Sequence, residues 1–154
     1  MTLRLAGEAD KPLLRAMLVP YLAEISGASA EGYPYFDDYW QEPGRRWPWL
    51  IGPRAAPQGF ALTRLLETEG ADGGPVRQLA EFYVCPEARR TGIGTAAAAA
   101  LLRRGPGLWQ VGILSGNAAA RRFWPAAISA AGGEMLEQTH GREGVIRLHL
   151  RMPA

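Results

Sequence analysis

The segment 81–95 carries the pattern with the clearest chemical meaning: Glu-Phe-Tyr-Val-Cys-Pro-Glu-Ala-Arg-Arg-Thr-Gly-Ile-Gly-Thr. It reads as a strand, a turn with proline, a loop with glycine, and the start of a helix. The first turn of a helix offers backbone N–H groups without partners and a partial positive charge. Gly92 and Gly94 lack a Cβ atom, so phosphate oxygens can approach those N–H groups, while Arg89 and Arg90 add cationic donors. The segment therefore predicts a pyrophosphate site.

Two familiar phosphate-binding motifs do not describe this loop. A P-loop requires Gly-Lys followed by Ser or Thr, which the sequence lacks here. A dinucleotide-binding fingerprint requires a third glycine and a βαβ unit that opens with the strand. The pattern Arg-x-x-Gly-x-Gly at 89–94 therefore matches neither motif.

Apolar periodicity and turn residues divide the rest of the chain into the elements that position this loop. The expected strands are 3–5, 47–51, 59–66, 76–84, 108–114, 134–139 and 145–152. The expected helices are a first one between the N-cap Asp10 and Ile25, then 35–41, 91–104 and 117–131. The order β-α-α-β-β-β-α-β-α-β-β predicts an α/β fold with a mixed sheet, as one domain over residues 1–154.

The strand 76–84 is irregular near Glu81. Leu79, Ala80 and Phe82 are apolar without a period of two, as a half-buried strand would require. Either a β-bulge or burial of both faces explains this pattern.

Composition excludes several classes of function. Seventeen cationic and fifteen acidic residues give a net charge of +2, which calls for neither a nucleic-acid nor a membrane partner. Cys85 is the only cysteine, so the chain forms no internal disulfide and no cysteine-based metal site, and we expect no metal. No apolar run is long enough to span a membrane, and charges in residues 1–10 argue against a secretory signal. We therefore expect a cytoplasmic protein.

A second segment gives the first one its context. Residues 117–124 read Asn-Ala-Ala-Ala-Arg-Arg-Phe-Trp and follow the expected strand 108–114. The two segments, with their spacing and the order of elements, resemble the GNAT superfamily of acyl-CoA-dependent N-acyltransferases. The resemblance covers nearly the whole chain, and it implies a sheet whose fourth and fifth strands splay apart, with acetyl-CoA as co-substrate.

The resemblance also implies roles for individual residues. The backbone of Phe82, Tyr83 and Val84 would pair with the pantetheine arm, as an added strand does. Asn117 would contact the pantetheine or cysteamine end, and Phe123 would pack near it. The residues implied in holding the pyrophosphate are Arg89, Arg90, Gly92, Ile93, Gly94 and Thr95.

Acyl transfer to an amine needs a base for the amine proton and a proton for the departing thiolate. The resemblance places Glu81 on the strand that faces the acceptor, and we expect it to act as general base through a water molecule. The family often has tyrosine where this chain has Trp124, and an indole cannot serve as the acid. Tyr83, Tyr39 or water are alternatives, so the general acid stays unassigned.

Half of the aromatic residues, seven of fourteen, fall within residues 33–49. The resemblance places this stretch over the acceptor cleft, so we expect Tyr35, Tyr39 and Trp40 to contact the substrate. Together with acidic side chains they could hold an apolar cationic amine; those acids are Asp37, Asp38 and Glu42. Alternatively, the rings cap the sheet edge or form the contact of a homodimer.

The sequence thus predicts an N-acetyltransferase that moves an acetyl group from acetyl-CoA directly to a primary amine of a small molecule or a peptide. The residue at position 124 keeps a second reading open, a non-catalytic acyl-CoA-binding or regulatory module. A protein-interaction domain that uses the aromatic stretch is a third.

Overall fold

A parallel pair of strands inside a seven-stranded sheet organises the fold in the computed structural model, which describes residues 2–26 and 33–154. The strands are β1 (Leu3–Leu5), β2 (Arg46–Ile51), β3 (Gly59–Glu69), β4 (Pro75–Val84), β5 (Gly107–Leu114), β6 (Glu134–His140) and β7 (Val145–Met152). The α-helices are α1 (Lys11–Ser26), α2 (Asp38–Gln41), α3 (Ile93–Leu102) and α4 (Ala118–Ala130). Short 3-10 helices are η1 (Glu8–Asp10), η3 (Pro86–Ala88) and η4 (Arg142–Gly144).

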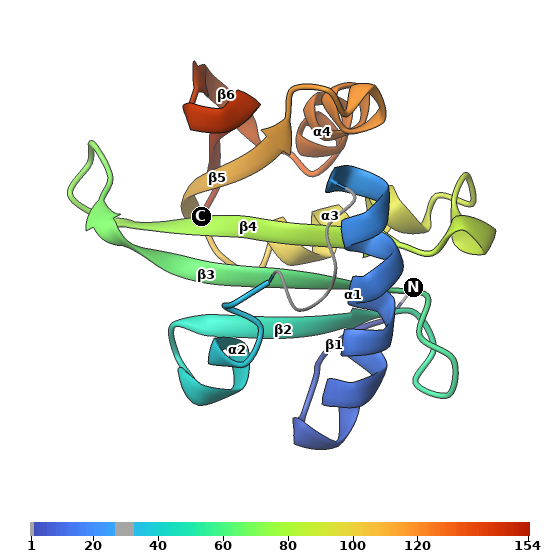
Figure 1. Ribbon diagram of the computed structural model, residues 1–154. Helices are drawn as coiled ribbons and strands as arrows, with labels where there is room; N and C mark the ends of the chain where they lie inside the picture. The colour runs from blue at the N-terminus through green and yellow to red at the C-terminus, as the bar shows by residue number, and fades with distance from the viewer. Residues whose placement is uncertain (1, 27–32) are drawn as a thin grey trace.

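The sheet order is β1-β2-β3-β4-β5-β7-β6, and Figure 1 shows these strands running across the molecule. All neighbours pair antiparallel except β4 and β5, which are parallel because α3 carries the chain back between them. The predicted mixed α/β fold and its order of elements are confirmed.

The irregularity near Glu81 is a β-bulge. On β3, Leu62 pairs with Glu81 while the next residue, Thr63, pairs with Leu79, so Ala80 is the extra residue of β4. Burial of both strand faces is therefore not needed to explain the broken alternation. A bulge increases the local twist and bends the strand that contains it.

Beyond this bulge, β4 and β5 separate. Their pairing runs from Val76 opposite Leu108 to Leu79 opposite Val111 and stops there. Residues 80–84 of β4 and 112–114 of β5 continue as strands without pairing to each other, and Figure 1 shows the two ribbons diverging. The splay implied by the family resemblance is present.

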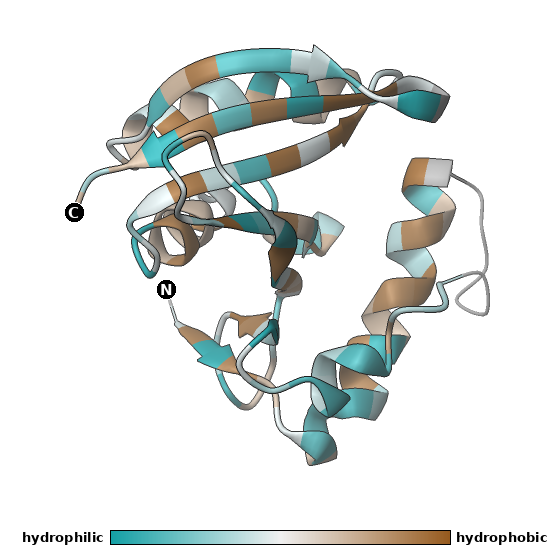
Figure 2. Cartoon of the chain, turned by 90° about the vertical axis from the view of Figure 1, so that its left-hand side faces the viewer, coloured by the Kyte–Doolittle hydropathy of each residue, from teal (hydrophilic) through white to brown (hydrophobic). Residues whose placement is uncertain are grey.

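Two apolar clusters hold helices on opposite faces of the sheet. Helices α3 and α4 pack through a cluster that includes Leu102, Trp109 and Ile128. On the other face, α1 and α2 pack through Leu18 and Phe60 with their neighbours. Figure 2 shows α1 standing on its own side of the sheet. The unpaired ends of β4 and β5 thus lie between the two groups of helices.

The helix bounds differ modestly from those expected. Helix α2 has four residues instead of the expected 35–41. Helix α3 begins at Ile93 instead of 91, because Gly92 caps it with φ of +86°, a left-handed conformation that ends helical geometry there. Asn117 is the N-cap of α4 and not its first helical residue.

Candidate active site

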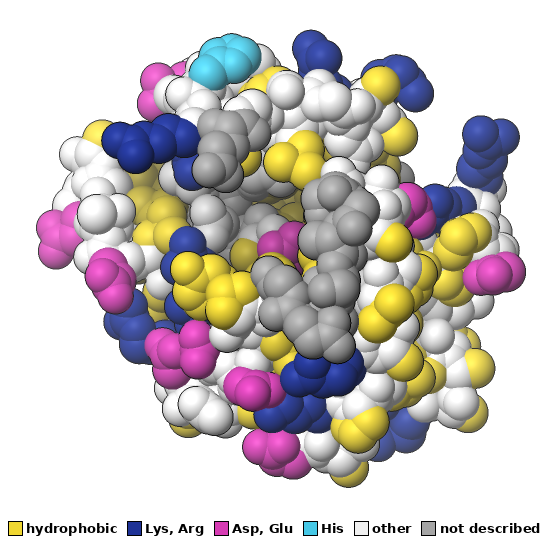
Figure 3. All heavy atoms as spheres, viewed as in Figure 1, with side chains coloured by type: hydrophobic (Ala, Val, Ile, Leu, Met, Phe, Trp, Pro, Cys, Tyr) yellow, Lys and Arg dark blue, Asp and Glu magenta, His cyan; other side chains and the backbone are white. Residues whose placement is uncertain are grey.

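A cavity of about 700 Å³ opens where β4 and β5 separate. Figure 3 shows the α1 face of the molecule hollowed near its centre, with an acidic side chain visible inside the hollow. The walls come from strands β2 to β5 and β7, from helices α1, α2 and α4, and from the segments before α2 and α4. The described lining residues are Tyr21, Leu22, Ile25, Tyr33, Tyr35, Tyr39, Arg46, Arg64, Gln78, Leu79, Ala80, Glu81, Phe82, Val111, Gly112, Ile113, Leu114, Asn117, Ala120, Trp124 and Val145.

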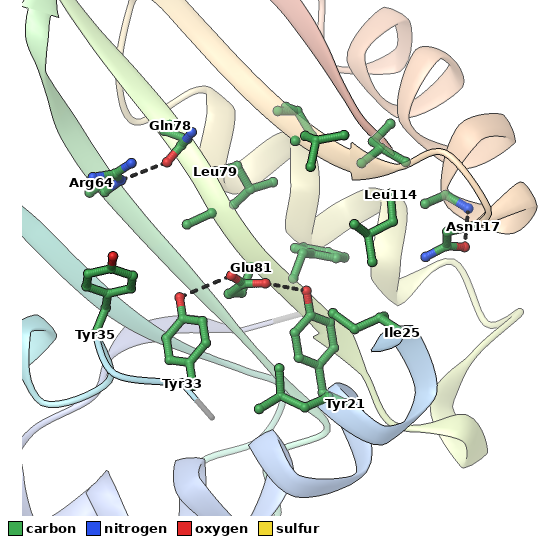
Figure 4. A pocket seen from close by; sticks show the side chains of 18 of the residues that line it. Tyr21, Ile25, Tyr33, Tyr35, Arg64, Gln78, Leu79, Glu81, Leu114 and Asn117 are labelled. Carbon is green, nitrogen blue, oxygen red and sulfur yellow. Dashed lines mark hydrogen bonds between the residues drawn. The ribbon is translucent and has the colours of Figure 1, made fainter. Parts of the chain in front are cut away.

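Glu81 lies at the centre of this cavity, directly after the bulge residue Ala80 (Figure 4). It is the only acidic side chain among the described lining residues. The hydroxyl of Tyr21 donates a hydrogen bond to its Oε1 at 2.7 Å, and that of Tyr33 donates to its Oε2 at 3.0 Å. Both carboxylate oxygens are thereby fixed, one from helix α1 and the other from the segment before α2.

Burial raises the pKa of Glu81 above the ordinary glutamate value, while the hydrogen bonds from Tyr21 and Tyr33 oppose that rise. Burial also raises the pKa of Tyr21 and of Tyr33, and the negative charge of Glu81 adds to the effect on both. The tyrosines therefore stay protonated and donate. A carboxylate with a raised pKa in a cavity is suited to accept a proton from a bound amine.

The tyrosine contacts extend away from Glu81 toward β2. The Tyr39 hydroxyl interacts with Tyr33 and with Arg46. The Arg46 guanidinium lies over the Tyr39 ring, 5.3 Å from its centroid, and over the Tyr35 ring at 5.9 Å. One wall of the cavity thus consists of tyrosine rings with their hydroxyl groups, and the guanidinium group of Arg46 lies at the β2 end of this wall.

Of the three predicted acceptor residues, two line the cavity and one does not. Tyr35 and Tyr39 are lining residues; Tyr35 is 55% exposed, whereas Tyr39 is buried. Trp40 lies outside, where its indole N–H donates to the carbonyls of Ala6 and Gly7, at 3.2 and 3.1 Å. This corrects its prediction as an acceptor contact, because the indole is held by those two carbonyls and Trp40 is not among the lining residues.

The three acidic residues that could have held a cationic amine beside these rings have other positions. Asp37 is an ion-pair partner of Lys11, at 2.9 Å, and of Arg15, at 3.5 Å. Glu42 pairs with Arg46 at 3.3 Å, and Asp38 is partly exposed at the start of α2. These three acids therefore do not line the cavity.

The end of β4 has the free edge that an added strand needs. Phe82 lines the cavity, whereas Tyr83 and Val84 are buried beside it and do not. Because β4 pairs with β5 only as far as Leu79, the backbone of residues 80–84 has no strand partner on that side. One group of this edge is occupied: the Val84 carbonyl accepts a hydrogen bond from Arg89 Nε at 2.8 Å.

The loop after β4 presents backbone N–H groups at the start of α3. Ile93, Gly94 and Thr95 form the first helical turn, whose N–H groups have no partner within the helix. A Cβ atom on Gly94 would lie 3.4 Å from the Phe123 ring, so glycine lets α3 and α4 approach closely. At Gly92 nothing lies within 4 Å of a Cβ position, and the positive φ explains the glycine there.

The two predicted phosphate-binding arginines differ. Arg90 is exposed and has φ of +64°, the only positive φ of a non-glycine residue in the described chain. The Arg89 side chain points toward β4 and α1. Its Nε donates to the Val84 carbonyl, and its Nη2 lies 2.8 Å from the Glu24 carboxylate of α1. The Arg89 guanidinium therefore ties the loop to α1 in this structure.

The second motif places three side chains at the wide end of the split. Asn117 lines the cavity, and its Oδ1 accepts a hydrogen bond from the Ala120 N–H at 3.1 Å, as an N-cap does. Trp124 also lines the cavity and is buried. Phe123 stacks on Phe82, with ring centroids 5.9 Å apart, and does not line the cavity. Of the alternative general acids, Tyr39 lines the cavity and Tyr83 does not.

Sequence reasoning missed five cavity residues with polar side chains: Tyr21, Tyr33, Arg46, Arg64 and Gln78. Tyr21 fits the apolar periodicity of α1, so it reads as a core residue. Arg46 and Arg64 are opposite each other in the pairing of β2 with β3, a relation that depends on strand register. Only the position of Tyr33 in the aromatic stretch gave a signal.

Across residues 2–26 and 33–154, no three His, Cys, Asp or Glu side chains are grouped to hold a metal ion. The helices of those ranges are all too short or too polar to cross a membrane.

Comparisons with known proteins relate this chain to acetyltransferases. The model of the acetyltransferase (GNAT) family matches residues 15–127. No curated protein matches the chain significantly. The solved structure of ribosomal-protein-alanine N-acetyltransferase from Brucella melitensis is similar over 100% of both chains, with a TM-score of 0.69 and 20% identity.

Two other solved structures share this fold. Aminoglycoside acetyltransferase AAC(6')-Ib, in complex with coenzyme A and kanamycin, has a TM-score of 0.71 and 19% identity, covering 98% of this chain and 94% of that one. Arabidopsis thaliana NAA60, in complex with a bisubstrate analogue, has a TM-score of 0.66 and 14% identity, covering 97% and 95%. At these identities the likeness shows the fold.

Proposed function

Because the chain belongs to the acetyltransferase (GNAT) family, whose members use acetyl-CoA, we propose that it transfers the acetyl group directly to a primary amine with Glu81 as general base. The observation that carries this proposal is the position of Glu81: a buried carboxylate in the cavity beside the split between β4 and β5. The acceptor is a small molecule or a peptide.

Residues of this chain fit acetyl-CoA, which supplies the acetyl thioester when bound. The unpaired first-turn N–H groups of α3 and the open space at Gly92 suit the pyrophosphate. The edge of β4 over residues 80–84 suits the pantetheine amides, and the Asn117 amide nitrogen remains available near the wide end of the split. In this arrangement Gly92, Ile93, Gly94 and Thr95 bind through their backbone, with Arg90 as an exposed cation.

Glu81 acts on the acceptor amine. An ammonium group cannot attack a carbonyl carbon, so the amine must lose a proton, and the Glu81 carboxylate accepts it directly or through water. The amine nitrogen then forms the new C–N bond while the C–S bond breaks, and the thiolate takes up a proton. A thiolate is a fairly weak base, so solvent can supply that proton without a dedicated acid.

The tyrosines give Glu81 its geometry and its surroundings. Tyr21 and Tyr33 hold both carboxylate oxygens, while the Tyr35 and Tyr39 rings form the wall that an acceptor would meet. These contacts support an acceptor site on the α1 side of β4, separate from the CoA-binding loop.

Glu81→Gln tests the proposal. The assay measures CoA release from acetyl-CoA with a panel of primary amines. We expect kcat to fall roughly 10²-fold or more, the usual contribution of a general base. Glu67→Gln removes the same charge from an exposed position on β3 and serves as matched control.

Calorimetry with acetyl-CoA separates the competing readings. Tight binding without turnover of any amine would favour the non-catalytic acyl-CoA-binding module. Absence of acetyl-CoA binding would contradict both readings. Full activity of Glu81→Gln across pH would refute the assignment of the base alone.

A further inference from the structure

The cavity is lined by side chains of opposite charge, one acidic residue on β4 and two basic residues on β2 and β3. Glu81 supplies the negative charge, and Arg46 and Arg64 are the only cationic side chains among the described lining residues. Figure 4 shows Arg64 and Gln78 on one side of Glu81, and Asn117 on the other. Since Asn117 and the split mark the CoA side, the arginines lie at the end of the acceptor space that is remote from the thioester.

Arg46 and Arg64 face each other directly across β2 and β3. Directly opposed residues of an antiparallel pair have Cβ atoms about 5 Å apart, and like charges in such a pair are destabilising. The strand register thus makes two arginine residues neighbours in the wall of one cavity, an arrangement that a bound anion would stabilise.

The two arginines differ in how their charge is compensated. Arg46 has a carboxylate partner, since its Nε lies 3.3 Å from Glu42 Oε2. Arg64 donates from Nε to the neutral Gln78 side chain, at 2.7 Å. Within the described part of the chain, its Nη1 and Nη2 have no hydrogen-bond or ion-pair partner. The two terminal nitrogens of the partly buried Arg64 side chain are therefore available to bind a ligand.

We propose that the acceptor amine carries a carboxylate at its far end, and that Arg64, with Arg46 beside it, binds this group. The inference deepens the proposed function and rests on it. Arginine binds carboxylates through two parallel N–H donors, and such charge-assisted bonds are strong where water is partly excluded. Glu81 and the arginine pair then orient one acceptor from its two ends.

Strand geometry sets the length of that acceptor. On β3, Arg64 is opposite Gln78 and Leu62 is opposite Glu81, so the bulge shortens the span between Gln78 and Glu81 to between two and three strand residues, about 7–10 Å. Part of this span is taken up by the hydrogen bonds at each end. The amine and the carboxylate should therefore be separated by about four or five carbon atoms, or by the equivalent length of peptide.

A series of matched amines tests this proposal. Pentylamine, 1,5-diaminopentane and 5-aminopentanoate share a chain of five carbon atoms and differ only in the far group. We expect kcat/KM to be at least tenfold higher for 5-aminopentanoate than for pentylamine, and lowest for the diamine. A peptide pair, Ala-Glu-Ala amide against Ala-Gln-Ala amide, distinguishes a peptide carboxylate from a free amino acid.

Variants assign the preference to Arg64. In Arg64→Gln the ratio of kcat/KM between 5-aminopentanoate and pentylamine should fall to about one. Arg64→Lys keeps the positive charge but lacks the planar guanidinium group, so we expect an intermediate ratio of kcat/KM between the two amines. This variant also gives an interpretable result if Arg64→Gln unfolds. Arg45→Gln is the matched control, because Arg45 is the exposed neighbour of Arg46 outside the cavity and should leave the ratio unchanged.

The outcomes separate the two levels of the proposal. Equal acetylation of pentylamine and 5-aminopentanoate would overturn the carboxylate site and leave the N-acetyltransferase function in place. If no amine reacts, calorimetry with the CoA-bound protein still decides: tighter binding of 5-aminopentanoate than of pentylamine, lost in Arg64→Gln, supports the site. Equal binding of both amines overturns it.

Discussion

The hydroxyl of Tyr21 lies 2.7 Å from Oε1 of Glu81, although the two residues are 60 positions apart in the sequence. Tyr21 belongs to α1 and Glu81 to β4, so this hydrogen bond joins one helical layer to the strand that faces the cavity. Tyr33 repeats the contact from the segment before α2. The orientation of the proposed base thus depends on elements that are distant in sequence, and this dependence makes it testable.

The first prediction concerns the pH dependence of wild-type activity. A general base works as a carboxylate, and burial raises the pKa of Glu81 above the ordinary value of about 4.3. kcat/KM should therefore decrease as the pH falls through that raised pKa. The midpoint of this acidic limb should lie above that of an exposed glutamate, in a pH profile measured with one amine at constant ionic strength.

The second prediction concerns Tyr21→Phe. The tyrosine hydroxyl stabilises the charged carboxylate, so its removal should raise the pKa of Glu81 further. The acidic limb should then move to higher pH, with kcat/KM about tenfold lower on that limb. Phenylalanine retains the edge-to-face contacts of the ring with Phe60 and Tyr83.

Tyr35→Phe is the control for the pH midpoint. Tyr35 lines the same cavity but makes no hydrogen bond to Glu81, so the midpoint should not move. An identical shift in both variants would show that general polarity, and not the specific hydrogen bond, sets the midpoint.

Much of this site could be predicted from the sequence, because it depends on local pattern. The broken alternation at Glu81 gave a bulge as one of two explanations, and the glycines at 92 and 94 marked the loop before α3. In each case the signal lies within a few residues of the feature.

The contacts that orient Glu81 could not be predicted in this way. Tyr21 occupies an apolar position of α1, and only the placement of α1 on the sheet brings its hydroxyl to β4. The opposition of Arg46 and Arg64 depends on strand register, which pattern analysis of each strand does not give. Trp40 was wrongly predicted to contact the acceptor, because it belongs to the aromatic segment 33–49 but its indole points away from the cavity.

The third prediction concerns stability. An acid whose folded-state pKa lies above its unfolded-state pKa binds more protons when folded, so ionisation of Glu81 costs stability as the pH rises through that window. At neutral pH, Glu81→Gln should therefore raise Tm, by about 2–4 °C if the gain is about 1 kcal/mol. The gain should shrink below pH 4, where glutamate is protonated in both states. An equal gain at every pH would contradict this account.

The fourth prediction uses two glycines with similar backbone geometry. Gly92 and Gly73 have φ of +86° and +77°, and neither has an atom within 4 Å of a Cβ position. Alanine at either site should cost about 1 kcal/mol through left-handed strain. Only Gly92→Ala should also weaken acetyl-CoA binding in calorimetry, because Gly92 is the N-cap of α3 whereas Gly73 lies in the turn between β3 and β4. Equal loss of affinity in both variants would contradict the proposed pyrophosphate site.

The fifth prediction tests the buried polar contact beneath the sheet. Trp49 Nε1 donates to Thr63 Oγ1 at 2.9 Å across β2 and β3, and Thr63 is the only buried polar residue of the described chain. Thr63→Val keeps the shape but leaves the indole N–H unpaired, so the free energy of unfolding should fall by about 1–3 kcal/mol. Denaturant unfolding at constant m-value measures this loss. Thr63→Ser keeps the hydroxyl and should lose less; a larger loss for serine would assign the effect to the missing methyl group instead of the hydrogen bond.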